Sequence, residues 1–281
     1  MLVQHQLYKS GLSLNQINQS IAVSILIASL IAYLSYKVKF LTLSGSIATF
    51  ILASLIFGLG GISWSVPILT FFILSSLLSK FRKRKNLGVE NFFEKSGVRD
   101  HMQVLANGGL GGVLVILNAV YPDHLFYLLY LASLSGACAD TWATEIGTWK
   151  KTPTYNILNG RKVEQGTSGG VSAVGTAGAL LGGLAITISG IAWTDISYLQ
   201  YAGLILFAGA AGSFIDSILG ATIQNQNRCP KCEKITERTV HCGTRTDHFR
   251  GLRLINNDAV NFLSGLAGVI LILFLNSFIK L

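Results

Sequence analysis

Charged residues are scarce in this 281-residue sequence. Asp, Glu, Lys and Arg make up 12% of the chain, whereas hydrophobic residues make up 51% and the mean hydropathy is +0.52. None of the four charged types occurs between Phe40 and Ser79. A water-soluble domain of this size cannot hide so much apolar surface in its core. The composition therefore excludes an ordinary soluble protein and indicates that lipid covers much of the chain.

Signals of several other protein classes are absent. No G-x-x-x-x-G-K-[ST] sequence occurs, which excludes a P-loop kinase, and no RNA- or DNA-binding motif is present. Residues 1–19 lack a basic region and an A-x-A cleavage site, so they are expected to remain as an amphipathic tail. No Pro-rich or Ser-rich linker divides the chain, and residues 1–281 are interpreted as a single membrane domain.

Several apolar runs are close to the roughly 20 residues that a transmembrane helix needs. A tight turn at residues 59–63 would divide the uncharged stretch into two such helices. The predicted fold is all-α, a polytopic integral membrane bundle of about eight transmembrane helices, with seven as the alternative. The runs are 21–36, 43–60, 64–79, 102–121, 125–139, 170–193, 199–215 and 259–279.

The basic residues are confined to one set of loops. Loops 37–40, 80–101, 150–169 and 224–258 contain 20 of the 22 Lys and Arg residues, and each follows an odd-numbered predicted helix. Because Lys and Arg near helix ends are retained in the cytoplasm, these loops are predicted to be cytoplasmic in the plasma membrane or an equivalent organellar membrane. The net charge of +9 is then one-sided, which suits lipid headgroups or phosphorylated substrates.

Two acidic residues occupy matching places in a short repeat. Asp140 and Asp216 each belong to a G-x-x-x-D-[ST] sequence near the end of a predicted helix, at residues 136–141 and 212–217. An ionisable side chain inside a span costs at least about 2.5 kcal/mol and is therefore a functional candidate. Glu145 is a third such residue, although an ideal helix turns it about 140° away from Asp140. Carboxylates that only hydrogen-bond neighbouring helices are the alternative.

Loop and helix-start sequences offer further polar groups. Free N–H groups at a helix start suit phosphate oxygens, and a loop with many glycines offers backbone donors. Helix capping and control of topology are the alternative roles of these residues. The candidates are Arg99, Gln103 and Asn107 before and in the fourth predicted helix, Thr167, Gly169 and Gly170 before the sixth, and Asn257, Asp258 and Asn261 at the start of the last.

Four potential ligands for a soft metal occur in loop 224–258. The sequence Cys229-Pro-Lys-Cys232 is followed by His241 and Cys242, a spacing that suits a structural zinc ion. A cytoplasmic loop disfavours disulfides. A second C-x-x-C pair is missing, so a set of reduced thiols is the alternative. Cys138 is predicted to lie in the core.

These motifs resemble a membrane family that includes plastid phytyl-phosphate kinase. The similar segments are residues 103–109, 139–147, 212–221 and 257–261, and the likeness runs from about Arg99 to Asn261. The family usually has Thr-Asn-Gly-Gly at residues 167–170, where this chain has Thr-Ser-Gly-Gly. It usually has Asp-Asn-Asp at residues 256–258, where this chain has Asn-Asn-Asp.

The resemblance implies transfer of the γ-phosphoryl group of CTP, or of another nucleotide, to a prenyl monophosphate such as phytyl or geranylgeranyl phosphate. Residues 140–147 also look like the signature of CTP-using dolichol kinase and phosphatidate cytidylyltransferase. The implied catalytic residues are Asp140, Glu145, Asp216 and Asp258, the first three as Mg²⁺ ligands. The implied substrate- and nucleotide-binding residues are Arg99, Gln103, Asn107, Thr141, Thr167, Gly169, Gly170, Ser217, Asn257 and Asn261.

Two other functions are compatible with the same residues. A cytidylyltransferase would form a CDP-lipid and release pyrophosphate, whereas a kinase releases CDP. A transporter would use the repeated G-x-x-x-D elements as a substrate path, but its polar residues should be accessible from both sides of the membrane. The expected partners are the membrane, a nucleotide and a prenyl monophosphate, and not nucleic acid; a homo-oligomer is also open.

Overall fold

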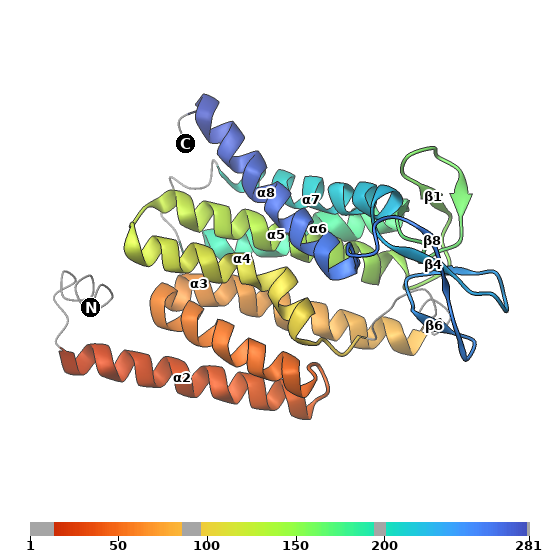
Figure 1. The fold of residues 1–281 in the computed structure, drawn as a ribbon. Helices are drawn as coiled ribbons and strands as arrows, with labels where there is room; N and C mark the ends of the chain where they lie inside the picture. Colours follow the sequence, from red (N-terminus) through yellow and green to blue (C-terminus); the bar gives the residue numbers. More distant parts are fainter. Residues whose placement is uncertain (1–13, 86–96, 194–200, 280–281) are drawn as a thin grey trace.

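The computed structural model describes residues 14–85, 97–193 and 201–279. Within these ranges the chain forms seven α-helices, which run side by side in a bundle (Figure 1). The helices are α2 (Leu14–Lys37), α3 (Leu43–Lys85), α4 (His101–Val120), α5 (His124–Gly147), α6 (Ala173–Ile191), α7 (Ala202–Thr222) and α8 (Asn257–Ile279).

Short strands form three small antiparallel sheets at one end of the bundle, which we call the polar end (Figure 1). The first sheet has the order β2-β1-β3, the second has the order β5-β4-β8, and β6 and β7 form a hairpin. The strands are β1 (Thr154–Asn156), β2 (Lys162–Val163), β3 (Gly170–Val171), β4 (Gln226–Arg228), β5 (Ile235–Thr236), β6 (Val240–His241), β7 (Thr244–Arg245) and β8 (Asp247–Arg250).

Helix α5 is the centre of the bundle. It packs against α3, α4, α6, α7 and α8, and its residues from Leu128 to Ala139 are all buried. The approach of α6 is especially close, because a Cβ atom at Gly178 would lie 2.6 Å from the carbonyl oxygen of Trp142. Small residues allow such backbone contact in lipid, where packing rather than the hydrophobic effect joins helices. This contact brings the loop before α6 to the C-terminal end of α5.

Helix α3 is interrupted at Gly61, whose φ and ψ angles are 64° and −158°. The chain reverses there, and the two halves of α3 run side by side (Figure 1). The ring of Trp64, just after the break, packs on Tyr130 with 4.6 Å between ring centroids. A straight helix of 43 residues would be about 65 Å long, twice the thickness of the apolar membrane layer, so the break makes two spans from one helix.

The fold is an all-α polytopic membrane bundle, as predicted, although the predicted count of about eight helices is slightly off. Two of the predicted runs, 43–60 and 64–79, are the halves of α3. Among the described residues, six helices are long and apolar enough to cross a membrane, and α5 is outside this set. Its C-terminal part contains polar residues, including Asp140 and Glu145, which lower its hydropathy. The predicted run 199–215 begins outside the described residues.

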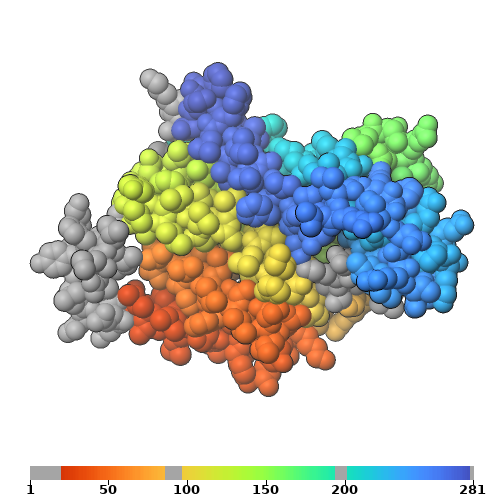
Figure 2. Space-filling model, viewed as in Figure 1, coloured from red at the N-terminus to blue at the C-terminus, as the bar shows by residue number. Residues whose placement is uncertain are grey.

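The described parts of the four basic loops all lie at the polar end (Figure 1). Loop 37–40 contacts loop 80–101, because the backbone N–H of Arg99 donates to the carbonyl oxygen of Phe40 at 3.0 Å. Lys234 forms a 3.2 Å ion pair with Glu164, which connects the other two loops. Residues 224–250 form a continuous surface with the start of α8 (Figure 2). The bundle sides, by contrast, expose large apolar residues such as Leu26 and Ile47, as expected where lipid contacts the helices.

Candidate functional site

A polar cavity of about 220 Å³ opens at the polar end of the bundle. Its walls come from the ends of α3, α5 and α7, the starts of α4, α6 and α8, and the loop between β2 and β3. The structure places all fourteen candidate residues from the sequence in this lining. They are Arg99, Gln103, Asn107, Asp140, Thr141, Glu145, Thr167, Gly169, Gly170, Asp216, Ser217, Asn257, Asp258 and Asn261.

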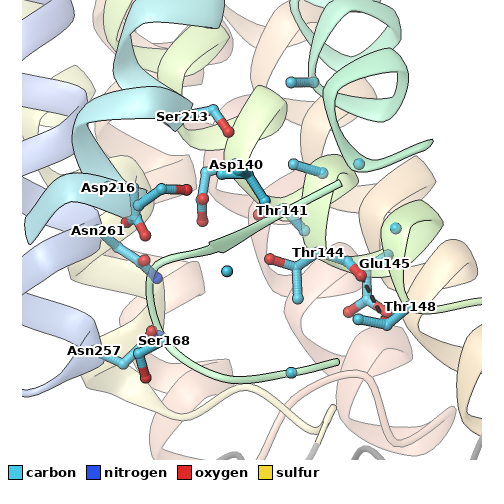
Figure 3. A pocket seen from close by; sticks show the side chains of 18 of the residues that line it. Asp140, Thr141, Thr144, Glu145, Thr148, Ser168, Ser213, Asp216, Asn257 and Asn261 are labelled. Carbon is cyan, nitrogen blue, oxygen red and sulfur yellow. Dashed lines mark hydrogen bonds between the residues drawn. The ribbon is translucent and has the colours of Figure 1, made fainter. Parts of the chain in front are cut away.

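Asp140 of α5 and Asp216 of α7 point toward each other across the cavity (Figure 3), and their carboxyl groups are within hydrogen-bonding reach. The G-x-x-x-D repeat explains this placement. A Cβ atom at Gly212 would lie only 3.0 Å from the Cα atom of Gly136, so the two helices touch at the repeat glycines. Residues four apart share a helix face, and the two aspartates therefore meet one turn further on.

The aspartate pair fits a divalent cation. The Oδ2 atom of Asp216 is buried and has no hydrogen-bond partner among the described residues. Two adjacent carboxylates repel each other, and an oxygen left without a partner adds to that cost. Carboxylate oxygens are the ligands that Mg²⁺ prefers in proteins, often together with substrate phosphates and water. Asp140 and Asp216 could therefore hold Mg²⁺ in the cavity.

The start of α8 adds amide groups to the same wall. Asn256 caps the helix, because its Oδ1 atom accepts a 3.0 Å hydrogen bond from the backbone N–H of Ala259. Asn256 is therefore the capping residue. Asn257 and Asn261 face the cavity and lie one turn apart (Figure 3). The Oδ1 atom of Asn261 is buried without a hydrogen-bond partner in the part of the chain that the structure describes. Both side chains can bind a ligand's polar groups.

The loop before α6 closes the cavity beside α7. Gly169 has a φ angle of 79°, and a Cβ atom there would lie 2.4 Å from the Cβ atom of Ala221. Glycine is therefore required both by the backbone conformation and by the close contact with the end of α7. The Thr167 hydroxyl donates to the carbonyl oxygen of Glu164 at 2.7 Å, so it is used within the loop. The Ser172 hydroxyl accepts from the N–H of Gly175 and caps α6.

Glu145 differs from the expectation that it shares a metal with the aspartates. Its carboxylate accepts hydrogen bonds from Ser79 at 2.6 Å and from Arg82 at 2.5 Å. The side chains of Arg82 and Glu145 are only 3% and 10% exposed. Figure 3 shows Glu145 apart from the facing pair of Asp140 and Asp216. The helical rotation between positions 140 and 145 explains the separation, and we assign Glu145 to the buried ion pair rather than to the metal.

Glu237 is a site residue that the sequence analysis missed. Its Oε1 atom accepts hydrogen bonds of 2.8 Å from both Ser168 and Gln224, and the residue lines the cavity. Its negative charge is close enough to interact electrostatically with both Asp140 and Asp216. Glu237 lies in a loop with several other charged residues, where no periodicity or motif distinguishes it. Arg82 was missed for a similar reason, because it lies in a run of basic residues.

A small apolar pocket of about 60 Å³ lies beside the polar cavity. Leu52, Phe57 and Phe71 are among its lining residues, and Arg99, Gln103 and Asn107 line both spaces. The guanidinium of Arg99 lies 5.9 Å from the centroid of the Phe71 ring, and it donates a 2.6 Å hydrogen bond to Ser76. A ligand with a charged head and an apolar tail would match this pair of adjoining spaces.

The predicted soft ligands also come together at the polar end. Cys229, Cys232, His241 and Cys242 each offer a ligand atom, and these atoms all lie within 4.8 Å of one another. Burial disfavours the Cys229 thiolate, but hydrogen bonds from His241 and from backbone N–H groups outweigh this effect and lower the pKa of Cys229 to about 6. Cys138 is buried in α5, where it was expected.

Comparison with known proteins identifies the family. Residues 26–269 match the family described as Integral membrane protein DUF92. Protein PGR of Arabidopsis thaliana is 32% identical over 265 residues, which cover 86% of this chain and 91% of that protein. Membrane protein MJ0933 of Methanocaldococcus jannaschii is 28% identical over 207 residues, with coverages of 73% and 83%. Protein VTE6, chloroplastic, of Arabidopsis thaliana is 23% identical over 245 residues, with coverages of 85% and 66%.

No solved structure gave a significant match. The family match extends from α2 to α8 and includes the helices that supply Asp140, Asp216 and Asn261. The chain therefore belongs to the DUF92 family of integral membrane proteins.

Proposed function

We propose that this protein is a prenyl-phosphate kinase, which transfers the γ-phosphoryl group of CTP to a prenyl monophosphate and forms the diphosphate. The observation that best supports the proposal is the meeting of Asp140 and Asp216 in a polar cavity that adjoins an apolar pocket. The resemblance of the surrounding motifs to the phytyl-phosphate kinase family supports the same reaction class. Another nucleotide with a γ-phosphate would use the same chemistry.

The shape of the site suits an amphiphilic acceptor. The prenyl chain would lie in and beyond the apolar pocket next to Leu52 and Phe71, and its phosphate would enter the polar cavity. Arg99 lies at the border between the two spaces, where its positive charge would meet the phosphate. The substrate would then reach the site from the membrane without leaving it completely.

The reaction needs positioning and charge stabilisation more than acid–base chemistry. An oxygen of the acceptor phosphate, already ionised, forms a bond to the γ-phosphorus, and the bond from that phosphorus to the β–γ bridging oxygen breaks. CDP leaves with the electron pair of that bond. Bound Mg²⁺ would supply charge compensation between the phosphates. Asp140 and Asp216 would hold it, and Asn257, Asn261 and backbone N–H groups near Gly170 would orient phosphate oxygens.

The test is a product analysis with purified protein in detergent, given CTP, Mg²⁺ and either phytyl or geranylgeranyl phosphate. We expect CDP and the prenyl diphosphate in equal amounts. Pyrophosphate together with a CDP-lipid would instead identify a cytidylyltransferase and refute the proposal. So would the absence of any nucleotide turnover that depends on the prenyl phosphate. We also propose that the polar end faces the cytoplasm, so that CTP should be used only when added to that side of sealed vesicles.

A further inference from the structure

We propose that Cys229, Cys232, His241 and Cys242 bind a structural Zn²⁺ ion, and that this ion keeps Glu237 in position at the cavity wall. The site is separate from the aspartate pair. Its ligands come from two turns of the strand region, Cys229 and Cys232 between β4 and β5, and His241 and Cys242 at the β6–β7 turn.

Three of the four ligand atoms are nearly as far apart as in a tetrahedral zinc site, and the Sγ atom of Cys229 lies within 4.8 Å of each of them. The Sγ atoms of Cys232 and Cys242 are 3.7 Å apart, and the Nδ1 atom of His241 lies 3.5 Å and 3.2 Å from them. Zinc bonds of about 2.3 Å to sulfur and 2.0 Å to nitrogen require ligand–ligand distances of roughly 3.5–3.8 Å. A disulfide would need sulfur atoms about 2.05 Å apart. The geometry therefore fits a metal ion and not a disulfide.

The backbone of both turns directs the four ligands to one point. In the first turn, Glu233 has a φ angle of 57° and its N–H donates to the carbonyl oxygen of Cys229 at 2.8 Å. The second turn has φ angles of 52° at Cys242 and 71° at Gly243, as in a two-residue type I′ hairpin turn. A left-handed conformation is unfavourable at Glu233 and Cys242, which are not glycine. Bonds from their turns to a shared ion would offset this cost.

The strand region has little else to hold it together. Between residues 224 and 250, the buried residues are Gln224, Gln226, Asn227, Cys229 and Thr236, of which only Cys229 is apolar. Its strands are only two to four residues long. A region this small without an apolar core usually needs a metal or a disulfide to remain folded. Three thiolates and an imidazole form a ligand set that prefers zinc to Mg²⁺ or Ca²⁺.

Glu237 lies in the chain between the two halves of the ligand set. Cys232 precedes it by five residues and His241 follows it by four. The segment is further held because Asn227 donates to the carbonyl oxygens of Glu237 and Arg238, both at 3.3 Å. The Glu237 carboxylate accepts hydrogen bonds from Ser168 and Gln224 at the cavity. An ion that fixes both flanks would therefore fix Glu237, which is a positioning residue for the loop that contains Gly169.

The first experiment measures metal in the purified full-length protein. We expect about one zinc per chain, and a cobalt-substituted sample should show thiolate-to-metal charge-transfer absorption. The double substitution Cys232→Ser/Cys242→Ser should lose the zinc, whereas Cys138→Ala, the matched control outside the cluster, should keep it. Protein that lacks zinc as purified, or a double variant that retains it, would overturn the metal site. Neither readout depends on kinase activity, so this test is independent of the proposed function.

The second experiment tests the connection to Glu237 by amide hydrogen exchange. Removal of zinc should speed exchange in residues 226–245 and also in residues 166–170, which Glu237 contacts through Ser168. Glu237→Gln should speed exchange in residues 166–170 while zinc remains bound, because the amide cannot accept both hydrogen bonds with the strength of a carboxylate. If residues 166–170 exchange at the same rate with and without zinc, the ion does not position Glu237.

Discussion

Substitution of Asp216 offers the sharpest test of the aspartate pair. If the pair binds a metal, removing the Asp216 charge should stabilise the protein without Mg²⁺, whereas if Asp216 only forms hydrogen bonds, the same substitution should destabilise it. The Oδ2 atom of Asp216 is buried without a partner among the described residues, and its carboxyl group faces Asp140 with Glu237 nearby. The substitution Asp216→Asn preserves the shape of the side chain and removes one negative charge. In protein without Mg²⁺, this removal should relieve repulsion between like charges.

The size of the relief can be estimated from Coulomb's law. Two full charges about 4 Å apart interact with about 4 kcal/mol at an effective dielectric constant of 20, and this is an upper limit because a shared proton would reduce it. We therefore expect Asp216→Asn to be about 1–2 kcal/mol more stable than the wild type without Mg²⁺. This corresponds to an increase in apparent Tm of about 2–8 °C for a chain of this size.

With Mg²⁺ the order should reverse. A metal at 100 times its Kd stabilises the folded protein by about 2.7 kcal/mol, and the wild type should show this increase while the variant shows little of it. Turnover of the variant should fall about a thousandfold, which corresponds to a loss of about 4 kcal/mol of transition-state stabilisation. The assays are apparent Tm with and without Mg²⁺, and CDP release from CTP with a prenyl phosphate.

The matched control is Asp247→Asn, which makes the same chemical change at an exposed position on β8, outside the cavity. It should leave the Mg²⁺ response and turnover unchanged. Lower stability of Asp216→Asn in the absence of Mg²⁺ would show that Asp216 serves only as a structural hydrogen-bonding group. Activity with wild-type Mg²⁺ dependence would equally refute the two-helix metal site.

Two further predictions concern the ion pair and the topology. Arg82→Met should destabilise the protein by about 3–5 kcal/mol because it leaves Glu145 buried without its countercharge, and Arg82→Met/Glu145→Gln should recover most of that loss. A single variant as stable as the double variant, judged by apparent Tm, would contradict this role. In a bacterial host, alkaline phosphatase fused after Tyr121 should be active, because it is exported, whereas a fusion after Arg161 should be inactive. Equal activity of the two fusions would contradict a cytoplasmic polar end.

The sequence predicted the fold and the site best where a local pattern along the chain determines the structure. The uncharged stretch predicted the two halves of α3 and the turn between them, and the G-x-x-x-D repeat predicted matching places for Asp140 and Asp216 near the ends of two helices. Glu145 shows the limit of such reasoning. The family resemblance implied that it shares a metal with the aspartates, but its direction and its pairing with Arg82 depend on how α3 packs against α5.

Glu237 could not be found from sequence for a different reason. It reaches the cavity only because two turns fold the strand region over the end of α7, and the hydrogen bonds that hold it come from Ser168 and Gln224. These are contacts between segments whose composition is typical of any polar loop. Tertiary contacts of this kind have no periodic pattern, whereas helices and their apolar faces do.

The break at Gly61 also bears on how the chain enters the membrane. The turn and both arms of α3 contain no charged residue between Phe40 and Ser79, while Lys37 and Lys39 precede the hairpin and Lys80, Arg82 and further basic residues follow it. A helical hairpin of this kind can be inserted as one unit from the side that keeps its basic ends, because no charge has to cross the apolar layer. The packed rings of Trp64 and Tyr130 join this hairpin to α5, the helix that supplies Asp140 to the cavity.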